Sequence, residues 1–245
     1  MKRILIISDL QIPFHDPRLV TNLIGFVKRY KPDQVVSIGD EIDLPSVSRW
    51  QRGTIGEYAG TIGRDRDMTV KILEQLRVND VVRSNHTDRL FNYIANQAPG
   101  LIGIPELQLE NFLRLPELGI TYHKKPMPIA PNWIAVHGDH GRISQVPGQT
   151  ALKQALQHGK SVVCGHTHRL GLTHATEASG GVIGRILTGL EVGNSMQFSK
   201  ASYTHGSANW QQGLGLLYVD GKNVTPVAMP VQRDGSFIVE GKRYG

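Results

Sequence analysis

Cysteine and long apolar runs are both scarce in this sequence of 245 residues. Its one cysteine, Cys164, excludes an internal disulfide framework and is typical of a protein from a reducing compartment. The first apolar run, residues 4–7, is too short for a signal peptide, and no stretch of the sequence is long enough to span a bilayer. We therefore expect a cytoplasmic protein that makes no membrane contact.

Linkers, internal repeats, low-complexity tracts and blocks of like charge are also absent from the sequence. The 27 glycines and 13 prolines are scattered as turn residues, so we expect residues 1–245 to form a single domain. Lysine and arginine outnumber aspartate and glutamate by 27 to 21, and the isoelectric point is near 9.5. This basic balance favours a polyanionic partner, although it would equally serve solubility.

The N-terminal part of the chain predicts a strand, a helix and a second strand. Apolar runs at residues 4–7 and 35–38 predict the strands, and apolar residues at helical spacing predict a helix that begins after Asp16. A helix between two short strands makes a βαβ unit, in which the strands are parallel and end at the same edge. Asp9 and Asp40, which follow the two strands, are therefore expected to lie close together.

Three further apolar strands are predicted at residues 81–84, 133–136 and 161–164. Around them, helical spacing predicts helices near residues 67–77, within 88–115 and near 149–157. From about residue 172 onward, β signals and turn signals dominate. We therefore expect an α/β fold of mixed sheets flanked by helices.

All five predicted strands end in side chains that can bind a metal ion. Ligands bind at the C-terminal edge of such sheets, and carboxylate, amide and imidazole donors suit a pair of transition-metal ions that one aspartate can bridge. An unpaired carboxylate at the end of a core strand is costly unless a cation meets it. The sequence thus predicts a metal pair held by Asp9, Asp40, Asn85, His137, His166 and His168.

Five ordered motifs carry a resemblance to a known family, the calcineurin-like metallophosphoesterase superfamily. The match covers residues 7–168, and the chain is most similar to compact bacterial and phage-type members of the family. The resemblance implies a four-layer αββα sandwich of two mixed β-sheets flanked by helices, with the β-rich tail in the second sheet. The motifs that carry it are Asp9 with Gln11, Gly39-Asp40 with Asp43, Asn85-His86, His137-Gly138 and Gly165-His166-Thr167-His168.

The resemblance also implies a role for each of these residues. A hydroxide between two divalent ions would attack phosphorus in line, because the ions lower the pKa of bound water toward about 7 and offset the charge on the phosphate oxygens. His86 would touch the phosphate or protonate the leaving oxygen. Mn²⁺ is the favoured metal, with Mg²⁺, Fe or Zn²⁺ as alternatives. Asp40 would bridge the ions, Asp9 and His168 would hold the first, and Asn85, His137 and His166 would hold the second.

Gln11 stands where most members of this superfamily have histidine. A glutamine oxygen is a harder and weaker ligand than imidazole, so a first site with Gln11 should favour Mn²⁺ or Mg²⁺ over Zn²⁺. Two interpretations stay open: Gln11 ligates weakly in a working pair of ions, or the first site is degenerate and the chain is a single-metal scaffold. Because every other ligand position is filled, we favour the first interpretation.

The acidic partner of His86 is a second open point. The superfamily usually has an acid directly after this histidine, where this chain has Thr87 and then Asp88. Asp88 is predicted either to orient His86 for catalysis or to cap the next helix. Asp43 is predicted either to support the metal site or to cap a turn.

Several cationic side chains near the motifs are candidates for substrate binding. Arg83 and Arg169 each lie beside a motif and could clamp phosphate oxygens. His140, just after the fourth motif, is a weaker candidate for phosphate contact. The role of His205 stays open.

The segment over residues 45–66 is predicted to be irregular and carries four arginines, Arg49 among them. Trp50 and Tyr58 are interleaved with these arginines, a pattern that suits a nucleotide or a single-stranded nucleic acid. Acidic residues dilute the charge, so a solvated loop is an equal interpretation.

Together these features predict a hydrolase that acts on phosphate ester bonds. The basic balance and the arginine-bearing segment favour a phosphodiesterase acting on nucleotides or nucleic acid. The alternatives are a phosphomonoesterase, such as a protein serine/threonine phosphatase, and the non-catalytic scaffold. Arg83 before Ser84 is similar to the phosphatase subgroup, but residues 39–46 lack the arginine that typically follows its second motif. The sequence leaves the oligomeric state open.

Overall fold

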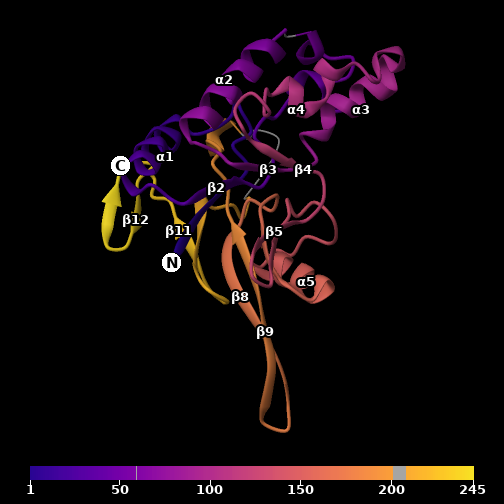
Figure 1. Ribbon diagram of the computed structural model, residues 1–245. Helices are drawn as coiled ribbons and strands as arrows, with labels where there is room; N and C mark the ends of the chain where they lie inside the picture. Colours follow the sequence, from indigo (N-terminus) through magenta and orange to yellow (C-terminus); the bar gives the residue numbers. More distant parts are fainter. Residues whose placement is uncertain (59, 201–207) are drawn as a thin grey trace.

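Strand β1 (Lys2–Ile7), helix α1 (Pro17–Tyr30) and strand β2 (Gln34–Ser37) form the predicted βαβ unit (Figure 1). β1 and β2 pair in parallel. α1 begins where the sequence indicates, because the Asp16 side chain accepts a hydrogen bond from the backbone N–H of Arg18 at 2.9 Å and a proline occupies the first turn. The two strands consequently end side by side at one edge of a sheet.

The computed structural model describes residues 1–58, 60–200 and 208–245, so His205 lies outside the described residues. Two mixed sheets dominate it, one with six strands in the order β11-β10-β1-β2-β3-β4 and one with five in the order β5-β6-β7-β9-β8. The first sheet also contains β3 (Asp80–Val82), β4 (Thr121–His123), β10 (Gly213–Asp220) and β11 (Asn223–Pro230). The second contains β5 (Met127–Ala130), β6 (Trp133–Ala135), β7 (Ser161–Cys164), β8 (Leu170–Ser179) and β9 (Val182–Val192). A separate hairpin contains β12 (Phe237–Val239) and β13 (Lys242–Tyr244).

The helices lie on the outer faces of the two sheets. Figure 1 shows α1 to α4 on the side of the first sheet and α5 on the side of the second. Within the described part of the chain, no helix combines the length and apolarity that crossing a membrane requires. Besides α1, the α-helices are α2 (Ile62–Gln75), α3 (Asp88–Gln97), α4 (Leu109–Phe112) and α5 (Gln149–His158), and the short 3₁₀ helices are Pro45–Val47, Ile55–Tyr58, Pro99–Leu101, Pro105–Leu107 and Phe198–Lys200.

The apolar side chains of β1 separate into two cores on opposite faces of the first sheet. Leu5 and Ile7 belong to the core that the sheet shares with α1, whereas Ile4 and Ile6 belong to the core that lies between the two sheets. A third apolar cluster, which includes Ala155, packs α5 against the other face of the second sheet. The layers are therefore helices, sheet, sheet and helix, which is the αββα sandwich that the sequence predicts.

Some helices and strands differ from the sequence prediction. α2 begins at Ile62, before the predicted start near residue 67. The predicted helical segment 88–115 is divided, because Pro99 and Pro105 each begin a short 3₁₀ helix between α3 and α4. The short strands β4 and β5 were not predicted, since neither carries enough residues to show a clear alternation.

The β-rich tail contributes to both sheets. β8 and β9 form a long hairpin, and β9 pairs in parallel with β7 in the second sheet. β10 and β11 return to the first sheet, where β10 runs antiparallel to β1. The expectation that the tail belongs to the second sheet is therefore wrong for β10 and β11. The reason is that residues 4–7 of β1 are buried, and the second edge of this strand needs a partner strand to satisfy its backbone N–H and C=O groups.

We expect Ile6→Ala to lower the free energy of unfolding by about 2–5 kcal/mol, because it removes buried methyl groups from between the sheets and leaves a cavity. Ile6 is fully buried, whereas Ile238 on β12 is 59% exposed. Ile238→Ala is therefore the control and should change the free energy by less than about 0.5 kcal/mol. Urea denaturation measures both, and equal shifts in the two variants would contradict a core between the two sheets.

Candidate metal centre

The loops after five strands meet where the C-terminal edges of the two sheets face each other. The loops after β1 and β2 run side by side, because the backbone N–H of Asp9 donates to the carbonyl of Gly39 at 3.1 Å and that of Gln11 donates to the carbonyl of Asp40 at 2.8 Å. The loops after β6 and β7 are linked in the same way, by the N–H of Gly165 and the carbonyl of His137 at 2.9 Å. Packing of one sheet on the other brings these two pairs of loops together.

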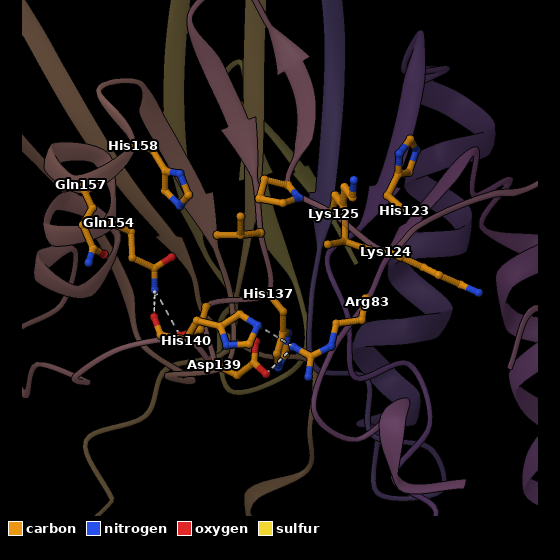
Figure 2. Close-up of a pocket in the computed structure, with 14 residues that line it drawn as sticks. Arg83, His123, Lys124, Lys125, His137, Asp139, His140, Gln154, Gln157 and His158 are labelled. Carbon is orange, nitrogen blue, oxygen red and sulfur yellow. Dashed lines mark hydrogen bonds and ion pairs between the residues drawn. The ribbon is translucent and has the colours of Figure 1, made fainter. Parts of the chain in front are cut away.

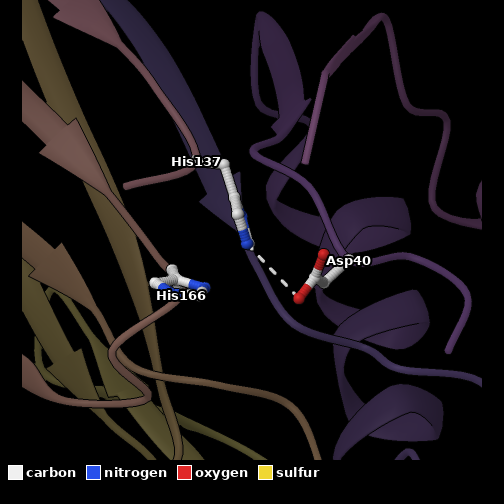
Figure 3. Close-up of side chains that lie close together, drawn as sticks. All are labelled: Asp40, His137 and His166. Carbon is white, nitrogen blue, oxygen red and sulfur yellow. Dashed lines mark ion pairs between the residues drawn. The ribbon is translucent and has the colours of Figure 1, made fainter. Parts of the chain in front are cut away.

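Asp40, His137 and His166 form one group of potential ligands, with donor atoms that all lie within 4.8 Å of one another (Figure 3). His137 Nε2 lies 3.3 Å from Asp40 Oδ2 and 3.0 Å from Asn85 Oδ1. Its other ring nitrogen, Nδ1, hydrogen-bonds to the carbonyl of Ile38 at 2.9 Å. A carbonyl at Nδ1 is the arrangement that fixes a histidine with Nε2 directed at a metal ion. Nε2 thus faces two oxygen acceptors, and a cation between them satisfies all three.

Asp9, Gln11 and His168 form the second group. His168 Nε2 lies 3.0 Å from Asp9 Oδ1 and 3.1 Å from Gln11 Nε2. Gln11 is 2% exposed, and its amide oxygen, Oε1, is buried without a hydrogen-bond partner in the part of the chain that the structure describes. A buried oxygen without a partner, on a side chain that contacts His168, is suited to a metal ion. The structure therefore brings Gln11 to the place where the sequence predicts the first metal.

Besides the backbone bond from Gln11 to Asp40, a hydrogen bond from the backbone N–H of His166 to Asp9 Oδ2 at 3.0 Å joins the two groups. The Ser8 hydroxyl donates to the same carboxylate oxygen. The Asp40 carboxylate contacts His137 and His86. The bridging role of Asp40 between two ions stays a prediction.

The backbone of the site is held in an unusual conformation. The φ angles are positive at Asp9 (51°), Gln11 (46°), Asp40 (56°), His166 (62°) and His168 (57°). Left-handed conformations cost residues other than glycine roughly 1–2 kcal/mol each, and such strain clusters where side chains must be aimed at a functional site. A Cβ on Gly165 would lie 1.9 Å from Ser8 Oγ, so only glycine lets the loop after β7 approach Asp9 this closely.

His86 lies beside the group formed by Asp40, His137 and His166, and two charged side chains contact it. Its Nδ1 lies 2.9 Å from Asp43 Oδ1, and its Nε2 lies 2.8 Å from Arg89 Nη2. Nε2 also lies 3.7 Å from Asp40 Oδ2. The ring is therefore fixed at the border of the metal site, with Asp43 as its acidic partner.

The structure does not bring Asp88 to His86. Asp88 forms an ion pair with Arg83 instead, and α3 begins without a side-chain cap from its N-terminal residues. Both interpretations of Asp88 are thus wrong, because the side chain is directed toward β3 rather than toward His86 or the helix N-terminus. Of the two acids considered, Asp43 is the one that contacts His86.

Arg83 and His140 line a pocket of about 180 Å³ that also borders His137 (Figure 2). The Arg83 guanidinium is paired with Asp88 and, at 2.5 Å, with Asp139. Arg83 Nη1 also lies 3.1 Å from His140 Nε2. A phosphate clamp formed by Arg83 or His140 would need these contacts to be exchanged, so that role stays a prediction.

Arg169 is 6% exposed and is used to hold the turn at residues 165–168. Its guanidinium donates to the carbonyl of Thr167 at 3.2 Å and to the Gln145 side chain at 2.6 Å. These partners occupy the guanidinium, and a phosphate clamp formed by Arg169 stays a prediction. Arg49, by contrast, lines a pocket that reaches Asn85.

Two residues that support the site were missed in the sequence. Arg89, which contacts both His86 and Asp43, follows His86 by three positions, a spacing that places two side chains on one helical face. Glu191 is fully buried and accepts hydrogen bonds from the Thr167 hydroxyl at 2.8 Å and from the backbone N–H of Thr150 at 2.8 Å. In the sequence, the only indication of Glu191 was an acidic residue inside an apolar strand. A buried carboxylate at such a position needs hydrogen-bond partners.

Two phage proteins are similar to this chain along nearly its whole length. The Gene 54 protein of Mycobacterium phage D29 is 40% identical over 250 residues, which cover 98% of this chain and 97% of that protein. The Gene 54 protein of Mycobacterium phage L5 is 40% identical over 251 residues, covering 98% of each. This chain belongs to their family. No family model matches it.

Solved structures are similar to this chain at lower sequence identity than these two phage proteins. Vacuolar protein sorting 29 from Cryptosporidium parvum has a TM-score of 0.48 and 15% identity, over 99% of this chain and 94% of that one. YfcE, a phosphoesterase from E. coli, has a TM-score of 0.39 and 15% identity, over 97% of each. The two packed sheets and the converging motifs of the chain itself confirm its resemblance to the calcineurin-like metallophosphoesterases.

The pKa shifts of the site residues show that the buried carboxylates stabilise positive charge beside them. Burial alone would raise the pKa of Asp40, but the facing His137 and His86 outweigh it and hold the pKa well below its usual range. Burial alone would lower the pKa of His137, but Asp40 outweighs it and raises the pKa to about 10. Burial and the neighbouring His137 lower the pKa of His166 to about 4. With no metal ion bound, protonated His137 is thus the cation that faces Asp40.

We expect the metal-free protein to lose thermal stability as the pH rises from about 6.5 to about 10. The folded-state pKa of His137 is raised to about 10 from 6.5, so the stabilisation is complete below pH 6.5 and disappears as the proton is lost. A saturating divalent ion should abolish this decline, because it takes the place of the proton. The unfolding temperature, measured by calorimetry in EDTA and in excess Mn²⁺, tests this.

The variant that tests this assignment is His137→Gln. In EDTA, its unfolding temperature should fall much less above pH 6.5 than that of the unchanged protein. Burial raises the pKa of Glu41 from 4.5 to about 7. Protonated Glu41 therefore stabilises the folded state, and this stabilisation is lost as the pH rises from 4.5 to about 7. This separate decline should remain in His137→Gln. A decline above pH 7 that is unchanged in His137→Gln would show that another group is responsible.

Proposed function

We propose that this protein is a metal-dependent phosphoesterase that hydrolyses phosphate diesters. The observation that carries the proposal is the convergence of buried oxygen and nitrogen donors from both sheets on one place, which is the ligand set of a divalent metal centre. The proposed first ion is held by Asp9, Gln11 and His168. The proposed second ion is held by Asn85, His137 and His166, with Asp40 shared between the ions.

The donor set fits divalent ions. Carboxylate and amide oxygens with neutral imidazoles suit Mn²⁺, and the amide oxygen of Gln11 lowers the preference for Zn²⁺ at the first ion. Bound ions would supply a water of lowered pKa and would offset the charge that develops on the phosphate oxygens.

His86 is the proposed proton donor to the leaving oxygen. Asp43 Oδ1 lies 2.9 Å from Nδ1 and is the acidic partner that positions the ring. Arg89, 2.8 Å from Nε2, is placed to donate to a phosphate oxygen once substrate is bound. Nε2 is then free to hold a proton and to give it to the leaving oxygen.

The diester preference is supported by the open space on both sides of the centre. One pocket borders His137 and another borders Asn85, so both substituents of a diester have room next to the phosphorus. A single-ion scaffold is the second candidate. It is favoured by the amide nitrogen of Gln11, which faces His168 at 3.1 Å where a ligating oxygen is expected.

The substrate test compares a diester with monoesters. With excess Mn²⁺, we expect the protein to bind two ions per chain and to hydrolyse bis-p-nitrophenyl phosphate faster than p-nitrophenyl phosphate or a phosphoserine peptide. Gln11→His should raise the affinity for the weaker ion and the rate at limiting metal. Cleavage of monoesters alone would replace the diesterase by a monoesterase, and one ion with no hydrolysis would establish the scaffold.

We expect His86→Gln to lower kcat by about 10²- to 10⁴-fold, the usual contribution of a general acid, while the protein still binds two ions. Asp43→Asn should lower kcat less and shift the alkaline limb of the pH profile, where a general acid loses its proton, since Asp43 acts through His86. His174→Gln is the control, because His174 is an exposed histidine of β8 that lines neither the pocket beside His137 nor the pocket beside Asn85. A kcat in His86→Gln equal to that of the control would remove His86 from the mechanism.

A further inference from the structure

A pocket of about 450 Å³ opens beside Asn85, between α3 and the chain that follows the 3₁₀ helix Pro45–Val47. We call it the α3 pocket. Its volume lies in the range of small-molecule and nucleotide sites. Arg89, which contacts His86, also lines it, so the α3 pocket continues directly from the proposed reaction centre.

One face of α3 forms a wall of this pocket. Arg89, Asn92, Tyr93 and Asn96 all line it and recur at intervals of three and four residues. The face extends about 10 Å along the helix axis from Arg89 to Asn96. Arg89, which contacts His86, lies at the end of this face nearest to His86. Asn92 and Asn96, whose amides can both donate and accept hydrogen bonds, lie farther along α3.

Two of the three arginines that line the α3 pocket have no ion pair among the residues that the structure describes. These are Arg49 and Arg52, whereas Arg89 is paired with Asp43. Many other arginines are neutralised by an adjacent acid; examples are Arg3, Arg18, Arg64, Arg66, Arg185 and Arg243. An anion is therefore the ligand that this pocket attracts.

An aromatic ring stands at the same place. Trp50 lines the α3 pocket and is 73% exposed, and the Arg49 guanidinium lies 4.6 Å from its ring centre. Exposed aromatic rings interleaved with arginines are the surface on which unpaired bases stack while their phosphates are held. The amides of Asn92 and Asn96 can hydrogen-bond to base edges, as asparagine does to adenine.

We infer that the α3 pocket binds an unpaired nucleotide of the substrate next to the scissile phosphate, with the base on Trp50 and the flanking phosphate on Arg49 and Arg52. The inference rests on the proposed function, which it deepens by naming the substrate as a single strand or a free nucleotide. A paired base in a duplex cannot stack on Trp50 without leaving its helix.

The test measures binding in EDTA, so that neither turnover nor bound metal enters the result. A fluorescein-labelled twelve-residue oligothymidylate is titrated with protein, and its anisotropy gives the dissociation constant. Trp50→Ala should weaken binding about tenfold. Phe91→Ala is the matched control, because Phe91 is also an exposed aromatic residue of α3, at 52%, but does not line the pocket.

The charge is tested by salt dependence. A single strand loses about 0.7 in the slope of log K against log salt for each phosphate contact removed, so the double variant Arg49→Ala, Arg52→Ala should reduce the slope by about 1.4. Arg77→Ala, an exposed arginine outside the pocket, should leave the slope unchanged. Displacement of the strand by thymidine 5′-monophosphate identifies a free nucleotide as sufficient, and failure of displacement assigns the pocket to a strand.

Two results would overturn the inference: equal affinity of Trp50→Ala and Phe91→Ala, or a duplex of the same sequence that binds as tightly as the single strand. The proposed function is tested separately by hydrolysis of bis-p-nitrophenyl phosphate with Mn²⁺. Hydrolysis without Trp50-dependent binding removes the inference alone. Trp50-dependent binding without hydrolysis leaves the pocket in place and removes the proposed function.

Discussion

The structure depends on two carboxylates placed where water cannot reach them. Asp9 and Asp40 are 0% and 1% exposed and lie where two packed sheets meet. Removing a charge from water is costly unless an opposite charge and hydrogen bonds meet it. Protonated His137 supplies that charge beside Asp40, His168 lies 3.0 Å from Asp9, and under the proposed function bound divalent ions would supply more positive charge. The order of the strands, the packing of the sheets and the turns at the strand ends all converge on this one requirement.

The turns around these carboxylates would not form in isolation. Each left-handed residue is unfavourable locally, and the surrounding hydrogen bonds compensate. The backbone at Asp9 and Gln11 is fixed by bonds to the loop after β2, and the turn after β7 is fixed by Asp9 itself and by Glu191. Glu191 also binds the N-terminus of α5, so the outermost helix and the turn at residues 165–168 share one buried acid. Local strain gathered at one place and supported from several layers is typical of a functional site.

The sequence predicted the strand ends well because the signal there is local. An apolar run followed by Asp, Asn or His marks both the end of a buried strand and the residue at its tip, and the βαβ unit determines which tips are adjacent. The partners of His86 could not be predicted in this way. Asp43 and His86 lie in loops after different strands, and their contact depends on how closely those loops approach. Asp88 is nearer in sequence, but the first turn of α3 directs it toward Arg83.

The charge of the chain shows the same contrast between composition and position. A net charge of +6 indicates a basic protein but not where an anion would bind, and many arginines are neutralised by neighbouring acids. The unpaired arginines Arg49 and Arg52 share a pocket with Arg89, and Arg89 in turn contacts His86. The same nitrogen of His86 that contacts Arg89, Nε2, lies 3.7 Å from Asp40 Oδ2. One imidazole therefore links the acidic centre, which attracts cations, to the basic pocket, which attracts an anion. Under the proposed function, a phosphate group would bind between them, because it can bind cations on one side and arginines on the other.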